Sequence, residues 1–355
     1  MTPYFLLLGI PAFFSLFKKT SKEEKKVSVI ALDIFFLIFL VLLCLRSVQC
    51  GVDQKNYLYF FNQVKGVGFI DLFFVYLEPG YFVLAKLTQI VTQNFQVLIA
   101  LISFLTVIPL WKMYRKETKN AYLTVILFAT VAPFTVYFSG LRQILAVTLG
   151  IPAYYYAKEK KPLHFLLIVL LAYFFHQSAL LLFILYPLYH IKLTKNSFYF
   201  IAPAILGVVA FGKEIFTFLL RFMGERYIQR YADVTSTGAY TVLILLFVFA
   251  LYAYILPDEK QLDAETLGLR NILLLCVAIQ SFAPVNTIAM RMNYYFLIFV
   301  PILIPKIAQA AKPHYKKLAG MSVVVMNLVF TAWFFYNAYR GGDMLNVFPY
   351  IPFWR

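Results

Sequence analysis

The chain has 355 residues, of which 62% are hydrophobic and 14% are charged, whereas about a quarter of residues are charged in an average soluble domain. This composition excludes an ordinary soluble enzyme and predicts an all-α polytopic membrane protein. The formal net charge of +16 comes largely from short basic clusters between apolar runs, a pattern typical of membrane topology and not of nucleic-acid binding.

Apolar runs that approach the ~17–25 residues needed to cross a bilayer recur from end to end. Basic clusters at 18–26, 112–119, 158–161, 192–195 and 312–317 should all lie in the cytoplasm. This requirement fixes a path of about 12 transmembrane helices with both termini outside. The predicted spans are 4–17, 27–45, 95–111, 121–138, 141–157, 162–175, 178–191, 197–211, 239–256, 270–285, 294–311 and 318–338.

Two segments require a choice. Residues 162–191 are short for two spans, but a single helix would place one of the flanking basic clusters outside, so we predict a tight hairpin with His176 at its outer tip. Residues 66–92 are predicted to be a re-entrant or interfacial segment broken at Glu78-Pro79-Gly80, because an extra span here would invert every later loop. The result is one integral membrane domain, 1–355, with outer loops 46–94 and 212–239 and an outer tail, 339–355.

The basic residues divide by type along this path. Those predicted inside are nearly all lysines, the exceptions being Arg115 and Arg270. Arginine outside runs against the orientation signal and needs another explanation, and its planar fork matches phosphate oxygens bidentately. The arginines predicted outside are Arg46, Arg142, Arg221, Arg226, Arg230, Arg291, Arg340 and Arg355.

Two polar motifs at the predicted outer edge indicate an anion site. Arg142 and Gln143 open the span 141–157, where the guanidinium and the helix N-terminus can hold a phosphate, although an arginine that snorkels to the interface would look the same. His176, followed by Ser178, is the only histidine predicted outside and can give a proton or a hydrogen bond to a leaving phosphate. A lone histidine is more often structural, so the two motifs support each other.

Asp53 and Glu78 are the outer carboxylates best placed to act as a general base, or else to neutralise an arginine. The sequence leaves both alternatives open. Other residues are also expected to contact substrate: Arg46, Tyr57 and Tyr81 nearby, Arg226, Tyr227 and Arg230 in loop 212–239, Arg291 and Asn293 near the start of span 294–311, and Tyr350 in the tail. The tail itself is expected to fold back over the site as a lid. Arg226 and its neighbours would also suit an interfacial helix.

Several familiar catalytic motifs are missing. The chain has no D-x-D for a metal-bound nucleotide sugar, no phosphate-binding P-loop, no H-E-x-x-H and no G-x-S-x-G. The sequence therefore predicts no metal site and no cofactor, and it favours a donor that is carried in the membrane.

At these residues the chain resembles the EpsG family of bacterial exopolysaccharide and capsule proteins, which are Wzy-like polysaccharide polymerases. The resemblance is carried by Arg46 with Gly51 and Asp53, Glu78-Pro79-Gly80-Tyr81, Leu141-Arg142-Gln143 with Ala146, Phe175-His176-Gln177-Ser178-Ala179, and Arg291 before Tyr294.

This resemblance implies a GT-C-like glycosyltransferase of the bacterial cytoplasmic membrane with its active site on the outer side. Its donor would be a glycan on undecaprenyl diphosphate, its acceptor the next lipid-linked repeat unit, and its partners the bilayer, a flippase and a chain-length regulator. Arg142 and Arg291 would hold the diphosphate, His176 would assist the leaving group, Asp53 or Glu78 would take the acceptor proton, and Tyr81 and Tyr227 would stack sugars.

Two other functions compete with this one. A flippase or transporter of the same lipid-linked glycan should carry polar residues through the full depth of the bundle, yet the mid-span positions are nearly all apolar. A membrane acyltransferase that modifies the glycan would also use a histidine, but it needs a route for an acyl donor from the cytoplasm.

Overall fold

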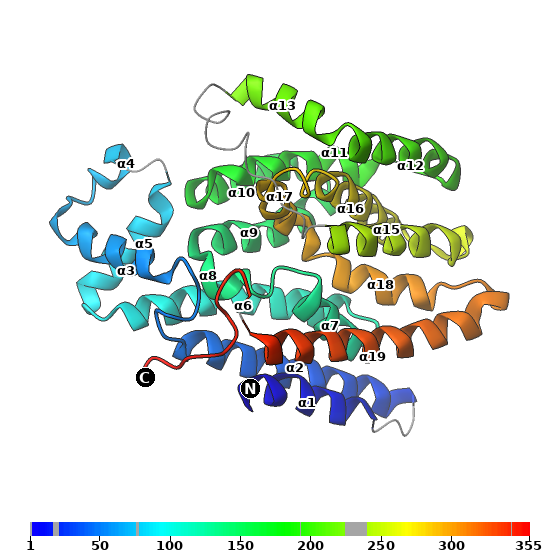
Figure 1. The fold of residues 1–355 in the computed structure, drawn as a ribbon, viewed down its shortest axis with the longest axis horizontal. Helices are drawn as coiled ribbons and strands as arrows, with labels where there is room; N and C mark the ends of the chain where they lie inside the picture. Colours follow the sequence, from blue (N-terminus) through cyan, green and yellow to red (C-terminus); the bar gives the residue numbers. More distant parts are fainter. Residues whose placement is uncertain (1, 17–20, 76–77, 192, 224–239, 342) are drawn as a thin grey trace.

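The structure is a computed structural model that describes residues 2–16, 21–75, 78–191, 193–223, 240–341 and 343–355. Within these residues the fold is all-helical and has no strand, only two isolated bridges between Arg46 and Pro352 and between Pro257 and Ala311. Figure 1 shows most of the helices lying side by side along one direction.

The long helices of the first half are α1 (Thr2–Leu16), α2 (Ser21–Leu45), α6 (Phe95–Glu117), α7 (Ala121–Thr130), α9 (Leu141–Lys158) and α10 (Pro162–Phe175). The second half contains α12 (Lys195–Ala210), α13 (Gly212–Met223), α15 (Tyr240–Ile255), α16 (Ala264–Gln280), α17 (Thr287–Leu297), α18 (Val300–Gln309) and α19 (Lys316–Arg340). Short elements join them: α3 (Gln54–Gln63), η1 (Val64–Gly66), α4 (Leu72–Val75), α5 (Pro79–Val91), α8 (Val136–Ser139), η2 (Gln177–Ile184), α11 (Leu185–His190), η3 (Glu259–Gln261) and η4 (Pro313–Tyr315).

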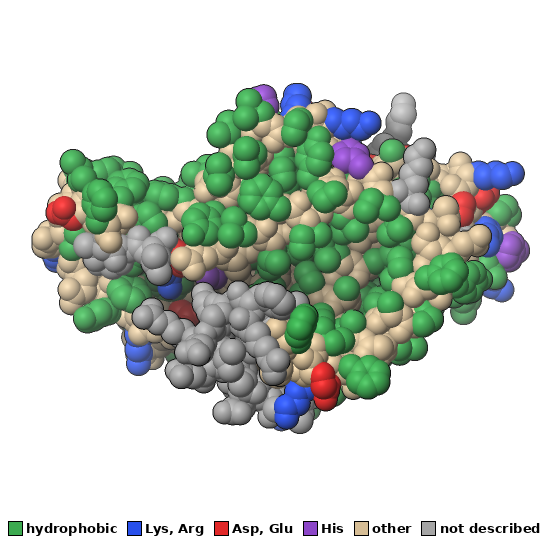
Figure 2. Space-filling view, turned by 90° about the horizontal axis from the view of Figure 1, so that it is seen from above, with side chains coloured by type: hydrophobic (Ala, Val, Ile, Leu, Met, Phe, Trp, Pro, Cys, Tyr) green, Lys and Arg blue, Asp and Glu red, His purple; other side chains and the backbone are tan. Residues whose placement is uncertain are grey.

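Large hydrophobic side chains are exposed along the sides of these helices. Leu167 on α10 is 56% exposed, and Leu328 on α19 is 67% exposed. Figure 2 shows hydrophobic side chains over the middle of one face and charged side chains mainly around its margin. Because soluble monomers rarely expose such continuous apolar surface, this surface is compatible with a polytopic membrane protein.

Among the residues that the structure describes, two helices are long and apolar enough to cross a membrane by themselves, Phe95–Glu117 and Pro313–Arg340. The pair Ile288–Leu297 and Val300–Gln309, bent by 52°, would form a third crossing if it is one broken span. The other apolar helices are shorter, so the count of about 12 spans stays a prediction.

Three predicted spans have a different local structure. Span 121–138 is interrupted because α7 ends at Thr130, shortly before Pro133, whose ring cannot continue a helix. Span 294–311 bends where α18 begins beside Pro301. Span 270–285 is shifted, since α16 starts at Ala264, where Asp263 caps it, and ends at Gln280.

The predicted hairpin at 162–191 does break at His176, but its second half starts as the 3₁₀ helix η2. A 3₁₀ helix rises about 2.0 Å per residue against 1.5 Å in an α-helix, so this winding gives a short segment more length. The 3₁₀ winding thus increases the length of this short segment. From the sequence alone, local thinning of the bilayer was the only explanation offered for so short a span.

An aromatic cluster fixes the segment that leads into α8. Phe39 of α2 stacks on Phe134 with ring centroids 5.1 Å apart and meets Phe128 of α7 edge-on at 5.5 Å. Tyr137 of α8 also packs against Phe39 at 5.4 Å. Such pairs contribute about 0.5–1.5 kcal/mol each beyond their buried area, so the segment 131–139 is held firmly in the interior.

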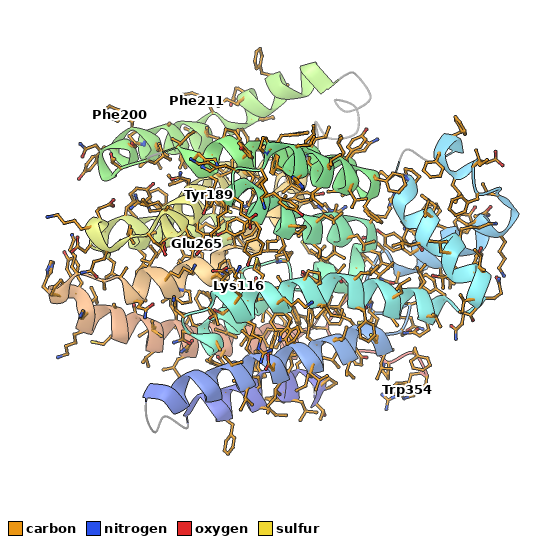
Figure 3. The ribbon with its side chains drawn as sticks, turned by 180° about the vertical axis from the view of Figure 1, so that it is seen from behind. Lys116, Tyr189, Phe200, Phe211, Glu265 and Trp354 are labelled. Carbon is orange, nitrogen blue, oxygen red and sulfur yellow. The ribbon has the colours of Figure 1, made fainter. Side chains whose placement is uncertain are left out.

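A second feature is an ionic cluster of four residues, Glu117, Lys158, Glu265 and Lys306, at the ends of α6, α9, α16 and α18. Lys306 Nζ lies 3.2 Å from Glu117 Oε2 and 2.9 Å from Glu265 Oε2, and Lys158 Nζ lies 2.9 Å from Glu265 Oε1. Figure 3 labels Lys116 and Glu265, which mark its place in the bundle. The side chains of Lys306 and Glu117 are each only 7% exposed, so these charges depend on one another.

The topology can be tested with single cysteines at two exposed lysines. Lys55 on α3 should lie outside, and Lys119, after α6, should lie inside. We expect Lys55→Cys to react with a membrane-impermeant maleimide on whole cells and Lys119→Cys to react only after lysis. The parent protein is the control for native thiols, because Cys44 is only partly buried, whereas Cys50 and Cys276 are buried. Labelling of Lys119→Cys alone on whole cells would reverse the orientation.

Candidate functional site

A cavity of about 270 Å³ lies where α3, α8, the start of α9, the end of α10 and α17 meet. Its wall contains four of the five residues predicted to be catalytic: Asp53, Arg142, His176 and Arg291. The fifth, Glu78, lies directly behind the wall. Residues far apart in the sequence therefore form one site, as the predicted topology requires.

Glu78 connects Arg142 to His176. Its Oε2 lies 2.9 Å from Arg142 Nη1, and its Oε1 lies 2.6 Å from His176 Nδ1 and accepts the Gln177 backbone N–H at 2.8 Å. With both oxygens occupied and only 11% of the side chain exposed, Glu78 is poorly placed to accept a proton from a substrate. It is well placed to orient the two cations, and it leaves His176 Nε2 as the ring nitrogen that can meet a substrate.

Burial alone would raise the pKa of Glu78, but the hydrogen bond and charge of His176, the Gln177 N–H and Arg142 outweigh it, so the pKa lies below the ordinary value of 4.5. A depressed carboxyl pKa contributes stability above the unfolded pKa, and this contribution is lost as the pH falls through the folded value. Glu78 therefore stays ionised, and keeps both partners, at every pH above about 4.5.

Gly80 sets the distance between α5 and the end of α10. A Cβ added at Gly80 would lie 2.6 Å from Phe175 Cδ1, 2.8 Å from Phe174 Cδ1 and 2.9 Å from the Phe174 carbonyl oxygen. Side chains can rotate away, but the carbonyl can move only if the end of α10 moves. Because α5 starts at Pro79, this close approach brings Glu78 to His176.

We expect Gly80→Ala to destabilise the purified protein by about 1–3 kcal/mol, the usual cost of overpacking. The measurement is thermal unfolding in detergent. Gly320→Ala on α19 is the matched control, because nothing lies within 4 Å of its added Cβ and alanine favours the helix. Equal melting temperatures for the two variants would show that a side chain at position 80 does not destabilise the protein, which would contradict this prediction.

Asp53 is positioned by the segment before α9. Ser139 Oγ donates to Asp53 Oδ2 at 3.0 Å and accepts the Asp53 backbone N–H at 3.3 Å. Gln54 Nε2 donates to the carbonyl oxygens of Phe138 and Ser139 at 2.7 and 3.2 Å. Gly51 has a φ of +117° and its backbone approaches the Phe138 carbonyl, a combination that a side chain would not allow. Asp53 thus has one oxygen held, and it faces the cavity.

The remaining wall residues include a second guanidinium, that of Arg291, and the hydroxyl of Tyr57. Arg291 is exposed to the cavity and has no acidic partner among the residues described, while its backbone carbonyl accepts from Gln143 Nε2 at 2.8 Å. Tyr57, also on the wall, accepts the Arg142 backbone N–H at 3.3 Å, and Arg142 lies 6.0 Å from its ring centre. A free guanidinium beside a partly paired one suits an anion such as a phosphate.

Five predicted substrate contacts lie elsewhere. Arg46 is fully buried and donates to the Leu43 carbonyl at 2.5 Å and to Ser103 Oγ at 3.3 Å. Tyr81 is fully buried, and its hydroxyl donates to the Tyr57 carbonyl at 2.8 Å, so its ring is closed to a sugar in this structure. The other three bind within the protein: Asn293 to the Cys276 carbonyl and Gln280, Ser178 to Tyr295, and Tyr350 to the Leu42 carbonyl.

Three further predicted contacts, Arg226, Tyr227 and Arg230, lie outside the described residues. The C-terminal tail does fold back as expected. The backbone N–H groups of Gly51 and Val52 donate to the carbonyls of Asn346 and Leu345 at 3.1 and 3.0 Å, and Leu345 lines the cavity.

Seven wall residues were not among the predicted site residues: Asn56, Phe60, Val136, Ser139, Gly140, Tyr294 and Leu345. Ser139 stands two residues before the start of α9 and three before Arg142, so its place in the motif was a usable signal. Nothing in the local sequence marks Leu345, because its position depends on hydrogen bonds across nearly the whole chain.

Comparison with known proteins extends the motif evidence to the whole length. The EpsG family matches residues 4–351, which include every element that forms the cavity. Neither the curated proteins nor the solved structures gave a match. The chain therefore belongs to the EpsG family, a family of Wzy-like polysaccharide polymerases.

Proposed function

We propose that the protein is a glycosyltransferase that joins undecaprenyl-diphosphate-linked repeat units at the outer face of the bacterial cytoplasmic membrane. The observation that carries this proposal is one cavity in which Arg142, Arg291, His176 and Asp53 lie together. Two guanidiniums suit a diphosphate, and a carboxylate with an imidazole suits proton transfer. Family membership supports a polysaccharide polymerase, and the cavity supplies residues for the chemical steps.

In the proposed reaction the donor is the growing glycan on undecaprenyl diphosphate. The glycosidic C–O bond to the phosphate breaks, and its electron pair stays on the diphosphate oxygen. Arg142 and Arg291 stabilise that developing charge in a site with little water, where fixed charges act most strongly. His176 Nε2 assists by donating a hydrogen bond or a proton to the same oxygen, and Glu78 holds the imidazole through Nδ1.

Asp53 is the proposed general base. It takes the proton of an acceptor hydroxyl on the next lipid-linked unit as that oxygen attacks the donor sugar carbon and forms the new glycosidic bond. The products are a glycan longer by one unit on the acceptor lipid and free undecaprenyl diphosphate. The geometry favours Asp53 over Glu78 because Asp53 faces the cavity, whereas both oxygens of Glu78 are engaged.

The direct test uses purified protein in liposomes with a synthetic undecaprenyl-diphosphate-linked repeat unit, in EDTA and without nucleotide sugar. We expect a ladder of lipid-linked oligomers, with one undecaprenyl diphosphate released per bond formed. The control is protein carrying His176→Ala, which should leave the units as monomers. Units that move between leaflets without becoming longer would favour a flippase, and a ladder that requires a nucleotide sugar would contradict the proposal.

A further inference from the structure

A second cavity, of about 460 Å³, lies between α6 and α9 and is lined mostly by apolar side chains. Leu105 and Pro109 form its α6 wall, and Leu149 and Pro152 form its α9 wall. Leu105 is 44% exposed, so the cavity borders the outer surface of the bundle. We call it the α6/α9 groove. The mechanism proposed above makes no use of it.

The groove lies along one face of α9, whose first residues line the site. This helix is buried on most sides, and its partly exposed positions include Arg142, Leu149, Pro152 and Tyr155. Leu145, which also lines the groove, is three residues after Arg142, a spacing that places both on the same helix face. Arg142 therefore stands at the start of the face that forms the floor of the groove.

The end of α10 provides a second link between the two cavities. Phe175 lines the groove, and the next residue, His176, lines the site. The groove thus begins beside both the guanidinium proposed to hold a phosphate and the imidazole proposed to assist it. At the far end Lys116 lies 3.8 Å from Glu117 and places its ammonium 4.4 Å from the centre of the Tyr155 ring.

We propose that the α6/α9 groove holds the first isoprene units of the polyprenyl chain whose diphosphate lies in the site, an inference that rests on the proposed function. The apolar lining cannot satisfy the hydroxyls of a glycan, but it suits a hydrocarbon that must leave a diphosphate and enter the membrane interior. The place of the groove beside Arg142 and His176 argues for this occupant over a bulk phospholipid. The groove then selects the carrier by its lipid chain and fixes the direction from which the diphosphate enters.

The first experiment measures binding without turnover. A glycan-free undecaprenyl diphosphate with a diazirine in its second isoprene unit is bound to the wild-type protein in liposomes and photolysed. We expect adducts in the peptides that contain Leu105 to Lys116 and Leu145 to Tyr155, reduced at least tenfold by excess unlabelled undecaprenyl diphosphate. Adducts confined to other helices, or adducts displaced by phosphatidylglycerol and not by undecaprenyl diphosphate, would overturn the proposal.

The second experiment fills the groove. Leu149→Trp is compared with Leu167→Trp, which adds the same bulk at an exposed position of α10 away from both cavities. Repeat units are supplied on a C55 or a C5 diphosphate, because a C5 chain has a single isoprene unit and leaves most of the groove empty. We expect the wild type and Leu167→Trp to prefer the C55 donor at least tenfold in kcat/KM, about the effect of burying two methylene groups. Leu149→Trp should lose that preference.

Equal losses on both donors in Leu149→Trp would contradict the groove as a chain-binding site. The two experiments also separate this inference from the proposed function. Adducts in α6 and α9 in a protein that never elongates a repeat unit would support the groove as the chain-binding site and contradict the polymerase function. Elongation with adducts on other helices would support the polymerase function and contradict the groove as the chain-binding site.

Discussion

Arg142→Ala is expected to lower the kcat/KM for elongation by about 10²–10³-fold, the usual effect of removing one fixed donor from a site of developing negative charge. Arg142 Nη1 is held by Glu78, and only part of the guanidinium remains for a ligand. Lysine has a single nitrogen and cannot keep Glu78 while it contacts a phosphate, so Arg142→Lys should give an intermediate loss. The measurement is initial elongation rate in liposomes at matched protein amounts.

Two controls show whether Arg142 acts on the substrate. Arg340→Ala removes an exposed arginine that lines neither cavity and should leave the rate unchanged. The double variant Arg142→Ala with Glu78→Gln removes the buried carboxylate that has lost one of its two cationic partners in the single variant. If Arg142 only neutralises Glu78, the double variant should recover the activity of Glu78→Gln. We expect it to stay as inactive as Arg142→Ala.

Asp53→Asn is expected to lower kcat by about 10²–10⁴-fold, the typical contribution of a general base. The amide keeps the shape of the side chain and can still accept the hydrogen bond from Ser139, so expression should be retained. The measurement is kcat for elongation in liposomes at saturating donor, with KM expected to change little.

Glu78→Gln provides the comparison, because it removes the charge that orients Arg142 and His176 and leaves Asp53 in place. We expect KM to rise and kcat to fall together. A larger fall of kcat in Glu78→Gln than in Asp53→Asn would assign the base to Glu78.

The meeting of Asp53, Arg142, His176 and Arg291 could be predicted from the sequence because each is a charged or titratable residue at the edge of an apolar run. Topology then places such edges on one face. The division of work between the two carboxylates could not be predicted. It depends on the close approach of α5 to α10 at Gly80. The sequence of either helix alone does not show which other helix packs against it.

The orientation of the Arg46 side chain could not be predicted from the sequence. An arginine just after an apolar helix can turn outward to a ligand or inward to carbonyls, and the local pattern is the same for both. Here the returning tail pairs Pro352 with Arg46, and α6 supplies Ser103, so the side chain turns inward. The fold has a similar limit at α7, because hydropathy measures the length of an apolar run, whereas a proline decides where its helix ends.

The ionic cluster at Glu117 and Lys306 restricts how the bundle can move. Any route for a polar head group between α6, α9, α16 and α18 would have to separate Glu265 from its lysines and Lys306 from Glu117. Leaving one buried charge of such a pair unpaired costs about 3–5 kcal/mol, so the cluster opposes the alternating opening that a carrier needs. We therefore propose that a polymerase locked in this way receives its repeat units at the outer leaflet from a separate flippase.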